Sequence, residues 1–121
     1  MLKISYICII CIVLFTLALL FVDKISPYDL TITRINGVAF RIKNYAMDNG
    51  HLPDNLYILP KREGYDNSIK DGWDKEIIYN VTKNGVVTLK SFGKDKKPRG
   101  EGDNSDIIMS FNVKISDKTD M

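Results

Sequence analysis

The sequence predicts an α+β fold, in which an apolar N-terminal helix precedes an amphipathic helix packed on a small three-stranded antiparallel sheet. The first observation behind this prediction is a run without charged residues that extends from Ile4 to Val22. The second is a helical spacing of apolar residues after Ser26, and the third is a set of three strand-like segments after residue 76. A chain of 121 residues has room for one small domain. The expected division is a membrane anchor or signal-anchor segment over residues 1–25, a globular domain over 26–115 and a polar tail over 116–121.

The apolar run has the length of a membrane-spanning helix. Its 19 residues would extend roughly 28 Å as a helix, close to the hydrocarbon thickness of a bilayer. The run ends without the small residues of a signal-peptide cleavage site, so we expect an uncleaved anchor that contacts the lipid bilayer. Lys3 in front of the run places the N-terminus in the cytoplasm, and a cleaved signal peptide is the alternative. Cys8 and Cys11 lie inside the run, where we expect them to act as small apolar residues.

Residues 26–50 carry the signals of a second helix. Ser26 is a suitable N-cap, Pro27 suits the first helical position, and Gly50 can adopt the left-handed conformation that ends a helix. Gly37 weakens the middle by up to ~1 kcal/mol relative to alanine, but we expect packing of the apolar face to preserve the helix. The apolar residues at helical spacing are Ile32, Ile35, Val38, Ala39, Ile42, Tyr45 and Ala46.

Three strands are expected after an irregular segment over residues 51–70. The first covers residues 77–81 and the second 86–92, with Asn84-Gly85 between them as a type I′ hairpin turn, in which both central residues have positive φ. Alternating apolar residues then predict a half-buried strand over 107–115. Trp73, which precedes the first strand, is expected to anchor the core, with a ligand-stacking surface as the alternative.

Charge and motifs exclude several functions. The 17 lysine and arginine residues nearly balance 15 acidic residues, so the chain lacks the strongly basic character of a nucleic-acid-binding protein. His51 is the only histidine, and we expect it to be a surface residue of a turn. The sequence contains no nucleophile elbow, phosphate loop or zinc-spaced cluster, so we expect the protein not to be an enzyme.

The segment before the last strand concentrates acidic residues. Its acids are Asp95, Glu101, Asp103 and Asp106, and glycines at positions 93, 100 and 102 allow its backbone to turn. Calcium takes about six to eight oxygen ligands from carboxylates and carbonyls, which such a loop can supply. The alternative is a solvated charged loop, favoured by four cations that would weaken a calcium site. These cations are Lys94, Lys96, Lys97 and Arg99.

Three blocks of the sequence resemble the globular domain of the major pseudopilin of type II secretion systems. Residues 45–53 read YAMDNGHLP and resemble the family's Y-x-x-D-N-G-x-Y-P, and residues 71–79 read DGWDKEIIY and resemble D-P-W-G-x-x-Y-x-Y. Residues 91–95 (SFGKD) and 100–107 (GEGDNSDI) resemble S-L-G-x-D and G-E-G-x-N-A-D-I, the most specific part of the match.

The resemblance implies a pseudopilin-like fold with a calcium-binding loop. It implies a structural Ca2+ bound by the side chains of Asp95 and Asp103, and completed or supported by the backbone carbonyls of Phe92 and Ser105 and by Asp106. Glu101 is expected to point outward. It further implies other pseudopilins or secretion-system subunits as partners. The expected location is the inner membrane, crossed once, with the C-terminal domain in the periplasm.

The sequence also departs from the family. Members have a basic leader with a Gly-Phe cleavage point and a glutamate near the start of the apolar helix, and neither matches Met1-Leu2-Lys3 or the run that follows. Lys96 and Arg99 stand where the family usually has glycine. These departures keep open a stand-alone exported domain, which would be a small binding domain, an enzyme without a recognisable signature, or an orphan relative that does not assemble into a filament.

Overall fold

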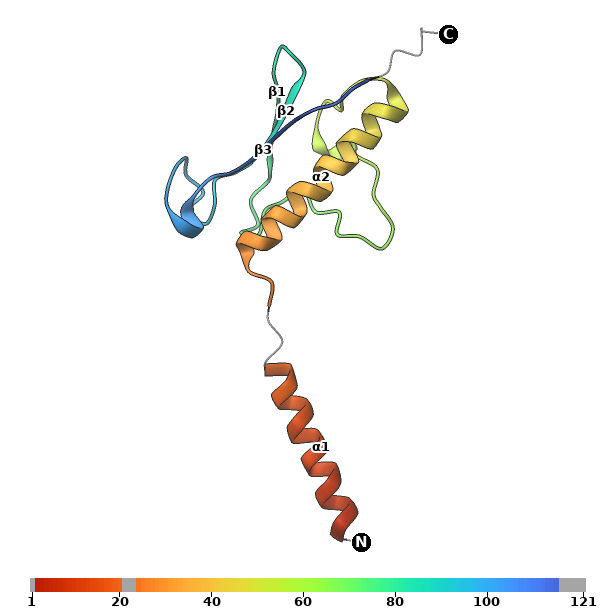
Figure 1. Ribbon diagram of the computed structural model, residues 1–121, viewed down its shortest axis with the longest axis vertical. Helices are drawn as coiled ribbons and strands as arrows, with labels where there is room; N and C mark the ends of the chain where they lie inside the picture. Colours follow the sequence, from red (N-terminus) through yellow and green to blue (C-terminus); the bar gives the residue numbers. More distant parts are fainter. Residues whose placement is uncertain (1, 21–23, 116–121) are drawn as a thin grey trace.

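The computed structural model describes residues 2–20 and 24–115 (Figure 1). The expected polar tail at 116–121 and the end of the apolar run lie outside the described residues. The elements are helices α1 (Leu2–Leu20) and α2 (Pro27–Asn49), the 3-10 helices η1 (Leu56–Ile58) and η2 (Gly102–Asn104), and strands β1 (Ile78–Val81), β2 (Val86–Ser91) and β3 (Ile107–Asn112). This order confirms the predicted α+β layout.

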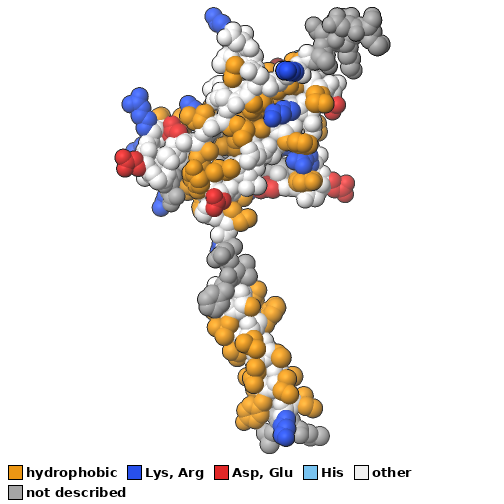
Figure 2. Space-filling view, viewed as in Figure 1, with side chains coloured by type: hydrophobic (Ala, Val, Ile, Leu, Met, Phe, Trp, Pro, Cys, Tyr) orange, Lys and Arg blue, Asp and Glu red, His pale blue; other side chains and the backbone are white. Residues whose placement is uncertain are grey.

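Helix α1 is apolar on all sides. Its 18 residues from Lys3 to Leu20 have a mean hydropathy of 2.5, and all of these side chains are exposed. Figure 2 shows the hydrophobic side chains along α1 on the visible face. By length and composition, α1 is therefore able to cross a membrane.

Helix α2 begins and ends where its capping residues predict. Ser26 accepts a hydrogen bond from the backbone N–H of Asp29 (3.1 Å), and Pro27 occupies the first position. Gly50 has a φ of 76° and donates its N–H to the carbonyl of Ala46 (2.8 Å). The helix continues through Gly37, as expected.

The sheet is antiparallel in the order β1-β2-β3. Its core side supplies Val87 and Leu89 from β2, both fully buried. Each strand is shorter than predicted, because strands end where their partners end. Val86 pairs with Asn112 as the last pair of β2 and β3, so residues 113–115 have no strand to pair with. Ile77, expected to begin β1, instead donates its N–H to the carbonyl of Ile69 (2.8 Å).

The β1–β2 turn differs from the predicted type I′ turn. Gly85 donates its N–H to the carbonyl of Thr82 (3.0 Å), so Lys83 and Asn84 are the central residues, and only Gly85 has a positive φ, of 78°. Thr82 donates its N–H to the carbonyl of Val86 (2.9 Å). This is the three-residue loop with glycine in the left-handed position, which the same Asn-Gly dipeptide also suits.

The core lies between α2 and the sheet, with η1 at its side. Its buried hydrophobic residues are Ile35, Val38, Ala39 and Ile42 of α2, Leu56 and Leu59 around η1, and Ile77, Val87 and Leu89 of the sheet region. Ile32 was expected on this face, but it is 36% exposed. Trp73 is half-buried and belongs neither to this cluster nor to the described residues packed on it, so the expectation of a core anchor is wrong.

An arginine of α2 holds the irregular segment before the sheet. Arg41 is only 6% exposed and donates to the carbonyls of Leu59 (3.0 Å), Pro60 (3.0 Å) and Asn67 (3.2 Å). Burial, and then the charge of Arg62, lower the pKa of Arg41. The carbonyls replace water around its guanidinium, which allows a charged side chain to lie at the edge of the core.

Candidate functional site

The acidic loop begins at the end of β2, where hydrogen bonds of Ser91 hold its first residues in place. We call this segment, residues 91–93, the anchored root of the loop. Ser91, which is 1% exposed, donates its hydroxyl hydrogen to Oδ2 of buried Asp71 (2.7 Å) and accepts the N–H of Gly93 (3.2 Å). Oδ1 of Asp71 accepts the N–H groups of Trp73 (2.9 Å) and Lys75 (3.0 Å). One carboxylate therefore connects the turn before β1 to the start of the loop.

Helix α2 contacts the same turn. Thr31 donates its hydroxyl hydrogen to the carbonyl of Pro27 (2.7 Å) and accepts the N–H of Gly72 (2.7 Å). A Cβ on Gly72 would lie 2.0 Å from the carbonyl oxygen of Pro27, so only glycine fits there. Glycine stands here at the position where the D-P-W-G motif has proline. Arg34 adds a hydrogen bond to the carbonyl of Asp71 (3.1 Å).

Short-range hydrogen bonds shape the interior of the loop. Asp95 accepts the N–H of Lys97 on Oδ1 (3.1 Å), which makes a local turn. Asp106 accepts the N–H of Arg99 on Oδ1 (2.9 Å), a contact that joins the middle of the loop to its end. Ser105 donates its hydroxyl hydrogen to the carbonyl of Gly102 (2.5 Å) and closes η2.

The loop places the predicted calcium ligands in different surroundings. Asp95 is exposed, whereas Phe92, Ser105 and Asp106 are half-buried. The backbone of Asp103 lies in η2, and its side chain is outside the described ones. Among the side chains that the structure does describe, no three acidic, histidine or cysteine residues gather as metal ligands. The predicted ligands that the structure describes are thus two carboxylates and two backbone carbonyls. All of them offer oxygen atoms, which are the ligands that calcium prefers.

The cations of the loop form no ion pair with a described acid. Lys94, Lys96, Lys97 and Arg99 are all exposed. Among the side chains that the structure describes, the ion pairs are Arg34–Asp66 (2.9 Å) and Lys70–Asp74 (3.6 Å), and both lie outside the loop.

Three non-glycine residues of the described chain have a left-handed backbone. These are Asp74 (φ 65°), Lys96 (φ 58°) and Arg99 (φ 66°). Lys96 and Arg99 stand where the family has glycine, and Asp74 aligns with the glycine of the D-P-W-G motif. The backbone therefore retains turns that glycine makes readily, although this chain has side chains at all three positions.

No role for Asp71 or Ser91 follows from the sequence alone. Their contact joins residues twenty positions apart, which no local pattern reveals. The available signal was that each residue begins one of the blocks that resemble the family, at positions 71 and 91.

Comparison with known proteins agrees with the fold. A search of curated proteins finds no match to the chain. The family description "Type II secretion system (T2SS), protein G" matches residues 24–110, well over half of the chain. The match begins just before α2 and extends into β3, so it includes the anchored root and the whole acidic loop. The chain therefore belongs to the family of protein G of the type II secretion system, the major pseudopilin.

Proposed function

We propose that this protein is a structural, non-enzymatic pseudopilin anchored in the inner membrane by α1, with residues 24–115 in the periplasm. The observation that carries the proposal is the order of the chain, in which a helix long and apolar enough to span a bilayer directly precedes a domain of the pseudopilin family. Lys3 at the start of α1 favours a cytoplasmic N-terminus. Its partners are then other copies and other subunits of the secretion system.

Cysteine labelling tests the topology. The native Cys8 and Cys11 are replaced by alanine, and single cysteines are introduced by Lys3→Cys or Ser110→Cys in the full chain. A membrane-impermeant maleimide should label Ser110→Cys once the outer membrane is permeabilised. It should label Lys3→Cys only after the inner membrane is solubilised with detergent. Recovery of the protein in the soluble fraction, with an N-terminus near residue 23, would instead indicate a released, stand-alone domain.

We further propose that the loop binds one structural Ca2+. Asp95, Asp103 and Asp106 would supply carboxylates, and Phe92 and Ser105 would supply carbonyl oxygens. The all-oxygen chemistry of this set supports the proposal, together with backbone turns that allow carbonyls to face inward. A bound ion would join the end of β2 to the start of β3 and stabilise the folded domain by RT ln(1 + [Ca]/Kd), about 2.7 kcal/mol at a hundredfold excess over Kd.

Thermal unfolding of the full chain in neutral detergent tests the calcium site. Calcium should raise the Tm relative to a chelator, and magnesium should have a smaller effect. Asp95→Asn and Asp106→Asn should abolish the increase, whereas Glu101→Gln, in the same loop and expected to point outward, should retain it. An equal Tm with calcium and with chelator in the unmodified chain would contradict the proposal.

A further inference from the structure

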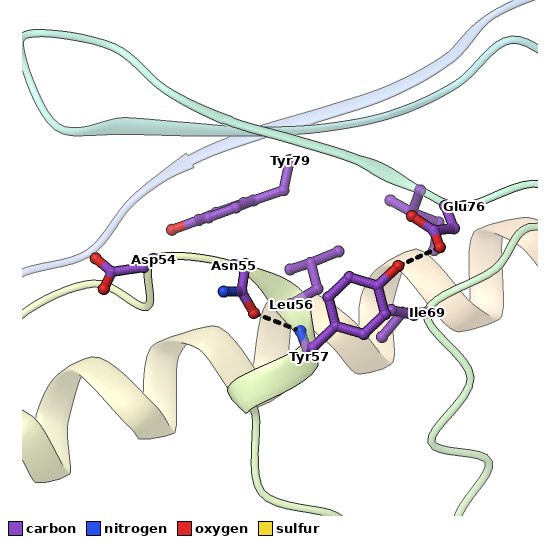
Figure 3. A pocket seen from close by; sticks show the side chains of 8 residues that line it. Asp54, Asn55, Leu56, Tyr57, Ile69, Glu76 and Tyr79 are labelled. Carbon is purple, nitrogen blue, oxygen red and sulfur yellow. Dashed lines mark hydrogen bonds between the residues drawn. The ribbon is translucent and has the colours of Figure 1, made fainter.

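A hollow lies between η1 and the segment that enters β1 (Figure 3). Its volume is about 190 Å³, and its apolar lining includes Leu56 and Ile77. The rings of Tyr57 and Tyr79 also line it, and Figure 3 shows Tyr57 beside Glu76, with Asp54 near the far end. The hollow therefore combines an apolar floor with two aromatic rings and two carboxylates.

The charges that line this hollow are all negative. Tyr57 donates its hydroxyl hydrogen to Oε1 of Glu76, and Tyr79 donates to the carbonyl of Pro53 (2.8 Å). Neither Asp54 nor Glu76 takes part in the two ion pairs of the described residues. The hydrogen bond to Glu76 raises the pKa of Tyr57, and burial followed by the charge of Asp54 raises the pKa of Tyr79.

Such surroundings suit a cationic side chain. Carboxylates form charge-assisted hydrogen bonds with ammonium and guanidinium groups, and tyrosine rings attract the same cations through their faces. The apolar floor can cover the aliphatic stem of a lysine or arginine.

The chain itself carries exposed cations that form no ion pair with any acid whose side chain the structure describes. Residues 94–99 contain four of them, and none pairs with a described acid. In Figure 1 the loop that carries them projects on the left of the view, well away from η1, which lies beside the C-terminal half of α2. Within one molecule, the basic loop and the hollow therefore do not meet.

We propose that the hollow receives a basic side chain from residues 94–99 of a second copy of this chain. The inference rests on the proposed assembly of copies, and it assigns the four cations a role that calcium binding leaves unexplained. The two surfaces differ, so the contact is heterologous, and its repetition from copy to copy builds either a ring or an open chain of subunits. Opposite charges on the two surfaces would also steer copies together.

Charge reversal on each side tests the contact. One variant of the full chain combines Asp54→Lys with Glu76→Lys, and a second changes Lys94, Lys96, Lys97 and Arg99 to glutamate. Contact is measured by co-producing Ile58→Cys and Pro98→Cys copies, without the native cysteines, and joining them with a short bismaleimide. Each reversal should lower the yield of joined pairs at least tenfold, and reversal of both sides should restore it. Lys83→Glu, at the hairpin tip, is the matched control and should leave the yield unchanged.

Two further measurements separate the inference from the proposed function. Cross-linking through the native Cys8 and Cys11 in α1 reports whether copies assemble at all. If those cross-links form but the Ile58–Pro98 pair does not, or if reversal has no effect, the inference is wrong while assembly stands. If neither cross-link forms, assembly and the inference both fail. Unfolding followed by Trp73 fluorescence must show that the reversed variants are folded, and failure of the double reversal to restore contact between folded copies overturns the inference.

Discussion

Glycine at two positions of the acidic loop should stabilise the protein. The φ angles of Lys96 and Arg99 are 58° and 66°, in the left-handed region where the Cβ of an L residue costs about 1–2 kcal/mol. Glycine removes that cost, but it loses about 0.5–1 kcal/mol more backbone entropy on folding. We therefore expect a gain of about 0.5–1 kcal/mol for Lys96→Gly or Arg99→Gly, and of about 1–2 kcal/mol for both together.

The fluorescence of Trp73 provides the assay. Trp73 is the only tryptophan and lies in the globular part, so its signal reports unfolding of that part without a contribution from α1. The full chain is unfolded by heat or urea in neutral detergent with a chelator present. A gain of about 1–2 kcal/mol corresponds to a Tm increase of roughly 5–10 °C for a domain of this size.

Lys97→Gly is the matched control for this prediction. It removes the same charge from the same loop, but Lys97 does not have a positive φ. We expect it to destabilise the protein by about 0.5–1 kcal/mol, the entropic cost of glycine alone. If Lys96→Gly and Arg99→Gly lower the stability as much as Lys97→Gly does, the left-handed backbone at these two residues does not carry the expected energetic cost.

Two other predictions concern buried and paired carboxylates. Asp71→Ala should lower the free energy of unfolding by about 2–3 kcal/mol in the same assay, because it leaves buried donors without an acceptor. As the control, Glu63→Ala at an exposed position should change the free energy of unfolding by less than about 0.5 kcal/mol. Equal effects of the two substitutions would contradict the role of the buried carboxylate. The N–H of Ser68, and then the hydrogen bond from Arg34, lower the pKa of Asp66. A lowered folded-state pKa gives stability that is present above the unfolded pKa of about 3.9 and lost as the pH falls through the folded pKa. Asp66→Asn should therefore flatten the acid limb of stability against pH, and an unchanged limb would contradict this assignment.

Local signals predicted the helices better than the sheet. Ser26, Pro27 and Gly50 act within one turn of the backbone, so α2 begins and ends where the sequence indicates. The length of a strand depends on its partner, and β3 stops at Asn112 because β2 begins at the residue opposite. Burial of Arg41 was not predictable from helical spacing, because it depends on carbonyls 18 to 26 residues further along the chain.

The position of the candidate site in the chain was predictable from the sequence, but the backbone conformation that shapes the site was not. The acids and glycines of the loop precede an alternating apolar segment, and this order correctly indicated that the loop lies between the last two strands. The turn conformations at Lys96 and Arg99 could not be derived from residue preference, since long side chains disfavour them. The family, which usually has glycine at both positions, was the better guide to the backbone there.

The close contact between Pro27 and Gly72 has a mechanical consequence. Pro27 is the first residue of α2, and the segment that leads to α1 ends there. Because the Pro27 carbonyl presses on Gly72, and Thr31 hydrogen-bonds to both residues, the first turn of α2 is fastened to the turn before β1. Tension along the chain from α1 would therefore act on the turn before β1 through this contact, and would not simply unwind α2 from its first residue. The first turn of α2 and the turn before β1 would move together under such tension.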